Sequence, residues 1–332
     1  MANDSFQDKT VLVTGAAGFV GSHLVDALLA QGAKVIGVDN FITGRRKNIE
    51  HLLAGQSDSG SGFSFIEADV VNPPQEYLPA GTQPDFVLHF ASPASPPGYQ
   101  AKPIETYLVN SLATHNLLQY LLETHPEATF LFASTSEVYG DPQVHPQPEE
   151  YWGHVNPNGV RSCYDESKRL GETICGVHHR DFGLDTRIVR IFNTYGPRIN
   201  PEDGRVIPQF IKESLAQQPL SLHGDGTQTR SYCYVSDLVE GILKMATTEG
   251  LAGETINLGN PDEHSIKETA EIIHQLINPD QELRLNVIPL PKDDPTRRKP
   301  NNSKAQRLLN WTPTVTFEEG LRRTIEHFKT QE

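Results

Sequence analysis

The sequence has 332 residues, 37% hydrophobic and 21% charged, which is the composition of a globular protein with a large core. Its formal net charge of −14 argues against nucleic acid as a partner, because phosphate backbones need clustered Lys and Arg. No apolar run reaches the ~20 residues that span a membrane, and the polar start resembles no secretory signal. Three cysteines without metal-ligand spacing predict a reducing compartment and no metal site, so we expect a cytoplasmic protein.

Strand and helix patterns alternate through the first 190 residues. Short apolar runs predict strands at residues 10–14, 34–38, 63–67, 85–90, 129–133 and 186–191. Amphipathic runs predict helices at residues 20–29, 104–124 and 164–180. This alternation predicts an α/β fold with a doubly wound parallel Rossmann sheet that has helices on both faces. Residues 56–62, rich in Ser and Gly, predict a surface loop.

The pattern changes after about residue 193, where Pro and Gly become frequent. Short helices are predicted at residues 207–217, 236–247, 266–277 and 317–328. We therefore expect residues 1–192 to form the domain that contains the sheet. Residues 193–332 would form mainly a smaller α/β lobe over the strand ends, with some segments returning to the first domain.

A glycine-rich turn, Gly15-x-x-Gly18-x-x-Gly21, separates the first predicted strand from the first helix. Glycines let the backbone turn sharply and approach a pyrophosphate, which then rests on the helix N-terminus. Asp39 ends the second strand about 20 residues further on, where a carboxylate accepts ribose hydroxyls and disfavours a 2′-phosphate. The turn and Asp39 together predict NAD as the cofactor. Asp69 and Val70, after the third strand, are candidates to contact the adenine.

Tyr164 and Lys168 form a YxxxK pair near the start of a predicted helix. Residues four apart share one helix face, so the Lys168 ammonium, aided by a positive nicotinamide ring, would stabilise a tyrosinate. A tyrosine of ordinary pKa ~10 could then act as a base near neutral pH.

Hydroxyl and carboxyl groups follow the strand at residues 129–133. Strand ends of a doubly wound sheet face its cleft, so Thr135 could hydrogen-bond a reacting hydroxyl and Glu137 could act as a second acid or base. Turn capping by Ser134 and Ser136, and a solvated loop carboxylate at Glu137, are the structural alternatives.

Longer runs resemble the extended short-chain dehydrogenase/reductases that act on nucleotide sugars, and within them the UDP-glucuronate decarboxylases, also called UDP-xylose synthases. The matching runs are the glycine turn, the YxxxK pair, and residues 39–44 (DNFITG), 89–97 (HFASPASPP), 134–166, 190–198 (RIFNTYGPR) and 293–300 (DDPTRRKP). The similarity extends from about residue 9 to residue 328.

The resemblance implies a redox-neutral decarboxylation of UDP-glucuronate. NAD+ would take a hydride from C4 of the sugar while Tyr164 takes the hydroxyl proton. The resulting 4-ketone is β to the carboxylate, so carbon dioxide can leave as an enolate forms. An acid would protonate C5, and return of the hydride would give UDP-xylose and NAD+. Thr135 and Glu137 would assist at the hydroxyl and the ring, and Arg298 would lie near the sugar carboxylate as a guanidinium fork.

The resemblance also implies the binding residues. Cofactor contacts are expected from Gly15, Gly18, Phe19, Val20, Gly21, Asp39, Asn40, Phe41, Thr43, Gly44, Asp69, Val70, Ala91, Ser92, Asn110, Tyr164, Lys168 and Arg198. Substrate contacts are expected from Ser95, Pro96, Tyr99, Glu137, Asn193, Arg205, Ile207, Gln209, Phe210, Gln228, Arg230, Tyr234 and Arg298. Asn193 would hold a phosphate or ribose, and Arg205, Arg230 and residues 207–211 would hold the diphosphate and uracil. The relatives commonly form homodimers through the helices that match residues 104–124 and 164–180.

Some positions depart from the relatives' pattern. Glu105 stands where they usually have Lys, His178 and His223 stand where they have Tyr, and residues 72–83 form a longer, Pro-rich loop. These departures concern the rim of the substrate site.

Three other functions stay open at this point. One is an oxidative decarboxylase that releases the 4-keto pentose and NADH. Another is a nucleotide-sugar 4,6-dehydratase or 4-epimerase, although dehydratases have Asp where Ser136 stands and epimerases usually lack an acid matching Glu137. The third is a non-catalytic NAD-sensing or scaffold protein, whose relatives typically lose the Tyr or Lys of YxxxK.

Overall fold

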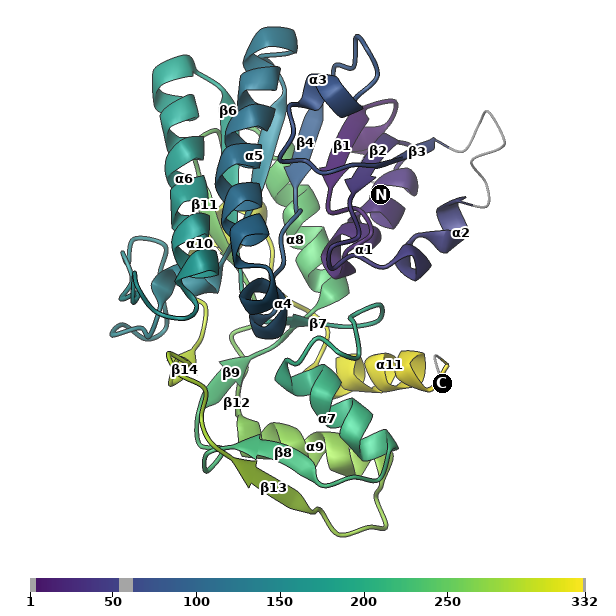
Figure 1. Ribbon diagram of the computed structural model, residues 1–332, viewed down its shortest axis with the longest axis vertical. Coiled ribbons are helices and arrows are strands. Elements are labelled where there is room, and N and C mark those ends of the chain that lie inside the picture. The colour runs from purple at the N-terminus through teal and green to yellow at the C-terminus, as the bar shows by residue number, and fades with distance from the viewer. Residues whose placement is uncertain (1–3, 54–61, 331–332) are drawn as a thin grey trace.

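A seven-stranded parallel sheet forms the centre of the protein (Figure 1), in a computed structural model that describes residues 4–53 and 62–330. The predicted loop at 56–62 falls outside these residues except for Gly62. In spatial order the strands are β3 (Phe63–Glu67), β2 (Lys34–Asp39), β1 (Thr10–Thr14), β4 (Phe86–His89), β5 (Thr129–Thr135), β6 (Asp185–Ile191) and β11 (Thr255–Leu258). All neighbouring pairs are parallel.

Helices cover both faces of the sheet. On one face lie α1 (Phe19–Leu29) and α8 (Val235–Thr247), and on the other α5 (Pro103–Thr124) and α6 (Ser162–Phe182), which run side by side in Figure 1. Alternate residues of β1 supply the two cores: Val11 and Val13 pack with the α1 side, and Leu12 packs with the α5 side. The predicted doubly wound α/β fold is confirmed.

The predicted elements agree with the observed bounds within two residues. Their ends follow local chemistry: Gly183 ends α6 in the left-handed conformation, and Ser265 caps α9 (Ile266–Ile277) in a capping box with Glu268. The Pro-rich segment at 72–83 contains a one-turn helix, α3 (Pro74–Tyr77), rather than loop alone. None of the described helices has the length and apolar character needed to cross a membrane.

Strand β11 was not predicted, although it completes the sheet. It comes from the C-terminal part of the chain and pairs with β6, from Thr255 against Ile188 to Leu258 against Ile191. Its four residues are too short to show a period, so only the pairing with β6 identifies them as a strand. The C-terminal segments thus contribute β11 to the central sheet and α8 to one of the helical layers that cover it.

The remaining C-terminal segments pack below the carboxyl ends of the sheet strands (Figure 1). They comprise α7 (Val206–Leu215), α9, α11 (Phe317–Lys329), the parallel pairs β7 (Thr194–Tyr195) with β10 (Cys233–Tyr234) and β8 (Leu220–His223) with β13 (Leu285–Ile288), and the sheet of β12 (Glu263–Ser265), β9 (Thr229–Ser231) and β14 (Arg297–Arg298). Helix α10 (Ser303–Leu309) instead packs against β11 and α8, at the central sheet. Short helices elsewhere are η1 (Asp4–Phe6), η2 (Arg46–Asn48), α2 (Glu50–Leu53), α4 (Pro96–Ala101) and η3 (Ser136–Tyr139).

Strand order reverses between β1 and β4, which lie side by side although β2 and β3 come between them in sequence. Such a switch point opens a crevice at the carboxyl ends of the strands. The glycine turn after β1, Asp39 at the end of β2, Ala91 after β4 and Thr135 at the end of β5 all lie at this edge.

Candidate active site

The glycine turn holds the N-terminus of α1 open to a ligand. Gly18 precedes α1 and makes no side-chain cap, so the first helical N–H groups are not used by a capping side chain. Gly15 has φ of 73°, and a Cβ there would lie 2.8 Å from the backbone nitrogen of Ala91. A Cβ on Gly21 would lie 2.0 Å from the Gly15 carbonyl oxygen. Both positions therefore require glycine.

The Asp39 side chain stabilises the glycine turn through hydrogen bonds to the backbone. Its carboxylate accepts hydrogen bonds from the backbone nitrogens of Ala17, at 2.9 Å, and Phe41, at 2.8 Å. Burial raises the pKa of Asp39, and the two backbone hydrogen bonds act against that rise. The predicted ribose acceptor therefore also fixes the loop after β2 to the loop after β1.

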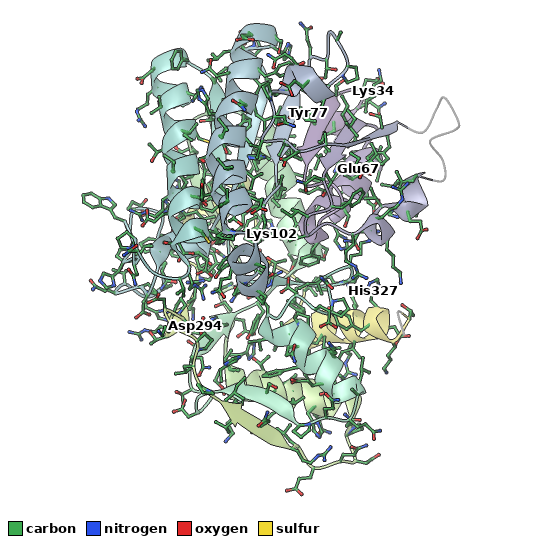
Figure 2. The ribbon with its side chains drawn as sticks, in the orientation of Figure 1. Lys34, Glu67, Tyr77, Lys102, Asp294 and His327 are labelled. Atoms are coloured by element: carbon green, nitrogen blue, oxygen red, sulfur yellow. The ribbon has the colours of Figure 1, made fainter. Side chains whose placement is uncertain are left out.

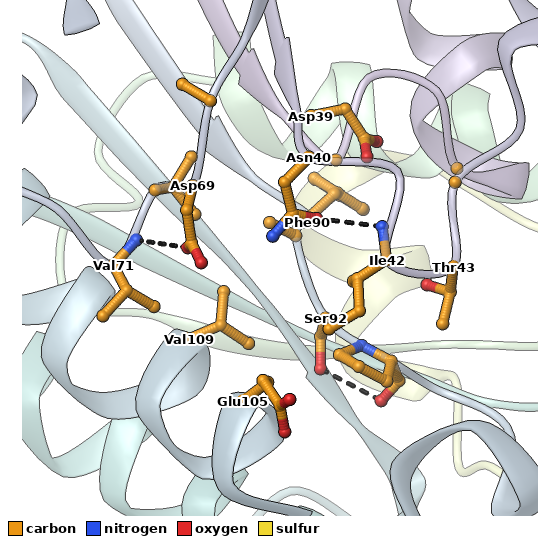
Figure 3. A pocket seen from close by; sticks show the side chains of 17 residues that line it. Asp39, Asn40, Ile42, Thr43, Asp69, Val71, Phe90, Ser92, Glu105 and Val109 are labelled. Atoms are coloured by element: carbon orange, nitrogen blue, oxygen red, sulfur yellow. Dashed lines mark hydrogen bonds between the residues drawn. The ribbon is translucent and has the colours of Figure 1, made fainter. Parts of the chain in front are cut away.

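A pocket extends from this turn across the ends of β2 and β4 (Figure 3). Its lining includes the predicted cofactor residues Gly15, Gly18, Asp39, Asn40, Thr43, Gly44, Asp69, Val70, Ala91 and Ser92. Glu105, from α5, also lines it, at a position where the resemblance has Lys. Asp39, Asp69 and Glu105 are the charged residues in the lining, and a carboxylate at the ribose position disfavours a further phosphate there, although Arg45 and Arg46 follow Gly44 directly in the chain.

The other predicted cofactor residues are not among those that line this pocket, and their role in binding stays a prediction. Phe19, Val20 and Gly21 form the first turn of α1. The Phe41 ring packs on Phe65, with centroids 5.4 Å apart. Asn110 donates to the Ser167 hydroxyl at 3.1 Å, and Arg198 pairs with Asp26 at 2.6 Å.

Tyr164 and Lys168 are both buried in the first turns of α6, 5% and 3% exposed. The Lys168 ammonium donates to the Ala133 carbonyl oxygen at 2.6 Å and lies 5.8 Å from the centroid of the Tyr164 ring. Burial lowers the pKa of Lys168 to about 7. Burial also raises the pKa of Tyr164, while a hydrogen bond with the Thr135 side chain lowers it. Tyr164 is therefore protonated near neutral pH until another cation is close.

Thr135 joins the end of β5 to this pair. Its hydroxyl accepts a hydrogen bond from the backbone nitrogen of Glu137 at 3.2 Å and so caps η3. The same side chain bonds with Tyr164. The sequence thus places Thr135 and Glu137 together because both belong to one short turn.

Glu137 is held between two arginines. Arg298, 2% exposed, donates to both carboxylate oxygens of Glu137, with Nη2 3.1 Å from Oε2. Arg161 donates to Oε2 at 2.6 Å. Although burial acts in the opposite direction, the two guanidinium groups lower the pKa of Glu137 to about 2. Glu137 is ionised in this arrangement, and Arg298 is directed toward it.

Two predicted substrate residues flank Tyr164. The Tyr99 ring, from α4, stacks on the Tyr164 ring, and its hydroxyl has no hydrogen-bond partner among the described residues. Arg205, at the start of α7, pairs with Asp203, and its charge acts on Tyr164 and Glu137. Ser95 and Pro96 begin α4.

Arg230 and Asn193 lie further along the C-terminal segments. Arg230 pairs with Asp294 at 2.7 Å, and the Asn193 carbonyl accepts from the backbone nitrogen of Cys233 at 2.8 Å. Figure 2 shows Asp294 beside β14, where the sheet meets the segments below it.

The remaining predicted substrate residues have partners elsewhere. Ile207 and Phe210 are buried in the core. Gln209 donates to Glu213 at 2.6 Å, Gln228 donates to the His223 carbonyl at 2.8 Å, and Tyr234 packs near Arg323. The described contacts do not bring these side chains to Tyr164, and their role in binding stays a prediction.

Sequence reasoning missed Arg161, Asp165 and Asp294. Arg161 also donates to Asp294 at 3.2 Å and therefore links Glu137 to the Arg230–Asp294 pair. Asp165 is buried next to Tyr164. Arg161 and Asp165 flank the YxxxK tyrosine, so polar residues that precede or follow it by a few positions were the available signal.

Comparison with known proteins identifies the family. The model for the NAD dependent epimerase/dehydratase family matches residues 11–259, three quarters of the chain. The chain belongs to this family.

Relatives in sequence include UDP-glucuronic acid decarboxylase 1 of Xenopus tropicalis, 47% identical over 97% of this chain and 72% of that protein. UDP-glucuronic acid decarboxylase 1 of Arabidopsis thaliana is 46% identical over 96% of this chain and 69% of that protein. Among solved structures, UDP-glucuronic acid 4-epimerase from Bacillus cereus, in complex with UDP-glucuronic acid and NAD, has a TM-score of 0.84 and 29% identity, over 97% of this chain and all of that chain.

The residues of this epimerase/dehydratase family member fit its cofactor, NAD. The uncapped α1 N-terminus and the glycines at positions 15 and 21 leave room for a pyrophosphate, and Asp39 lies at the ribose position of the fold. The acidic lining of the pocket favours NAD over its 2′-phosphorylated form.

Proposed function

We propose that the protein converts UDP-glucuronate to UDP-xylose and carbon dioxide, with NAD+ regenerated in each turnover. The proposal rests on the position of Arg298. This buried guanidinium donates hydrogen bonds to Glu137, which lies in the same short turn as Thr135, the hydrogen-bond partner of Tyr164. A guanidinium beside the sugar-oxidising residues suits a sugar that carries a carboxylate. The decarboxylase names of relatives 46–47% identical support the same reaction.

The chemistry follows from these positions. When bound, NAD+ supplies the hydride acceptor for C4 and, later, the hydride donor to the same carbon. Tyr164 takes the C4 hydroxyl proton while Thr135 orients that hydroxyl. Oxidation at C4 makes the substrate a β-keto acid, whose carbon–carbon bond to the carboxylate breaks with the electron pair left in an enolate. A proton then goes to C5, and Tyr164 returns its proton to the C4 oxygen.

Glu137 has a specific part in this scheme. Because Arg161 and Arg298 keep it ionised, it acts as a base or as the charge that orients Arg298, not as a proton donor. A substrate carboxylate would compete with Glu137 for Arg298.

Incubation with UDP-glucuronate tests the proposal. We expect UDP-xylose and carbon dioxide in equal amounts, with no net rise in NADH absorbance. NADH accumulating in proportion to carbon dioxide would instead indicate an oxidative decarboxylase that releases the 4-keto pentose. Formation of UDP-galacturonate without carbon dioxide would indicate a 4-epimerase. The Bacillus cereus structural neighbour is named as such an enzyme.

We also propose that the protein is a homodimer formed through α5 and α6. Both helices pack on the same face of the sheet and expose large apolar side chains, namely Ile104, Tyr107, Leu112, Leu170 and Phe182. Exposed apolar side chains on adjacent helices suit a two-fold helix-pair interface. A monomeric mass in light scattering would contradict this.

We also propose that the protein acts in the cytoplasm, because its three cysteines are free thiols, as is usual in a reducing compartment.

A further inference from the structure

Asp165 is a buried carboxyl group that the proposed mechanism does not use. It lies in the first turn of α6, directly after Tyr164, and is 6% exposed. Its Oδ1 has no hydrogen-bond partner among the described residues. Buried carboxylates are usually paired with a cation or with several donors. Asp165 lacks that support.

The nearby cations are engaged by other carboxylates. Arg298 donates to Glu137, and Arg161 divides its donors between Glu137 and Asp294. The charged and titratable groups that face Asp165 are Glu137 from η3, Arg298 from β14, Tyr99 from α4, and Arg161, Cys163, Tyr164 and Glu166 from its own segment. An ionised Asp165 would therefore add a second buried negative charge beside Glu137.

A polar cavity connects this group to the surroundings. Asp165, Glu137 and Arg161 share the wall of a cavity of about 380 Å³ with Asp141, His154 and Asp293. A polar space of this size accommodates many water molecules, since each needs roughly 10–15 Å³ of such volume. Asp165 can therefore exchange its proton with solvent even though it is buried.

We propose that Asp165 is a positioning residue for the charge of Tyr164: it carries a proton when Tyr164 acts as the base, and its ionisation opposes loss of the tyrosine proton. The inference rests on the proposed role of Tyr164. Two anions on consecutive residues of one buried turn repel each other, so each makes the other harder to form.

The balance of burial and charge favours this behaviour. Burial, and next the negative charge of Glu137, raise the pKa of Asp165 to about 7, although Arg161 and Arg298 act to lower it. Burial raises the pKa of Tyr164 most, and the charges of Glu137 and then of an Asp165 carboxylate raise it further. The group would thus change charge near neutral pH.

The test is the pH dependence of kcat with UDP-glucuronate for the wild type, Asp165→Asn and Glu166→Gln. Removing the Asp165 charge should move the rising limb of kcat to lower pH by about 0.5–1 unit, because one opposing anion is lost. Glu166→Gln is the matched control, since it removes a half-exposed carboxylate one residue away that pairs with Arg169. It should shift the midpoint much less than Asp165→Asn does, because Glu166 is the smallest of the charges that act on Asp165.

An unchanged midpoint in Asp165→Asn, with kcat lowered equally at every pH, would overturn the proposal and leave Asp165 a structural role. A wild type that releases no carbon dioxide would instead refute the proposed function. A pH titration of the carboxyl ¹³C resonances of wild-type protein labelled at aspartate tests the ionisation of Asp165 independently of turnover. It also applies if the Asp165→Asn variant does not fold. One carboxyl should titrate near neutral pH, and a spectrum without any such carboxyl between about pH 6 and 8 would contradict the inference.

Discussion

The rings of Tyr99 and Tyr164 stack face to face, with centroids 5.0 Å apart and planes 6° from parallel. The contact joins α4, after the fourth strand of the sheet, to the first turn of α6, and both rings are buried. The stack fixes the plane in which the Tyr164 hydroxyl can lie. Tyr99 therefore positions the proposed base.

Two replacements of Tyr99 should distinguish the contribution of its ring from that of its hydroxyl group. A stacked aromatic pair contributes about 0.5–1.5 kcal/mol beyond the area it buries, so Tyr99→Leu should lower kcat roughly 2- to 12-fold. Tyr99→Phe keeps the stack and should retain kcat within about twofold, with any loss appearing in KM for the sugar nucleotide. Steady-state kinetics measure both, and an unchanged kcat in Tyr99→Leu would show that the stack does not position Tyr164.

Tyr164→Phe removes the proposed base but retains the stacked ring. General acid–base catalysis contributes about 10²–10⁴-fold, so kcat should fall by that factor. The glycine turn and Asp39 are untouched, so NAD should still bind, as followed by quenching of protein fluorescence. Turnover like that of the wild type would remove Tyr164 from the mechanism.

Glu137→Gln should weaken both catalysis and the fold. The neutral amide no longer pairs with the charges of Arg161 and Arg298, and a hydrogen bond to a charged group contributes about 1.5–3 kcal/mol. We expect a loss of that order in the free energy of unfolding by urea at pH 7, together with slower sugar oxidation.

The pH dependence has a definite sign. The pKa of Glu137 is depressed from 4.5 to about 2, so its stabilisation is complete above the upper value and is lost as pH falls through the lower one. The stability difference between the wild type and Glu137→Gln should therefore shrink as pH falls below about 4.5. A difference that stays constant down to the lowest pH at which the protein folds would contradict the ion pairs.

What the sequence could predict was local. The glycine turn, Asp39 and the YxxxK pair depend on spacings of a few residues to about 20 residues, which strand and helix periods fix. Glu137 and Arg298 could each be named, but 161 residues separate them, and nothing in the spacing indicates that one holds the other. Strand β11 was missed for the same reason, because its identity depends on β6. Asp165 escaped notice because its burial, not its residue type, makes it unusual.

His89 provides the last prediction, on the pH dependence of stability. The Thr14 hydroxyl accepts from the backbone nitrogens of Phe90 and Ala91 and lies 2.7 Å from Nδ1 of His89. Because the Thr14 hydroxyl already accepts two hydrogen bonds, it donates a hydrogen bond to Nδ1 of His89. Nδ1 therefore carries no proton and the ring is neutral. Nε2 carries the ring proton and donates a hydrogen bond to the Val109 carbonyl at 3.1 Å. Burial, and then the charge of Lys168, lower the pKa of His89 from 6.5 to about 3.

Because the pKa of His89 is lower in the folded protein than in the unfolded chain, between about pH 6.5 and 3 the unfolded chain binds a proton at this histidine that the folded protein does not bind. The contribution of His89 to stability is therefore complete above pH 6.5 and decreases as pH falls from there towards 3. One such group changes the free energy of unfolding by at most about 1.4 kcal/mol per pH unit. His89→Gln should be less stable at pH 7.5 but should lose less stability between pH 6.5 and 5.5, by about 1 kcal/mol in urea unfolding. Equal slopes for the wild type and His89→Gln would show that His89 accepts a proton in the folded state.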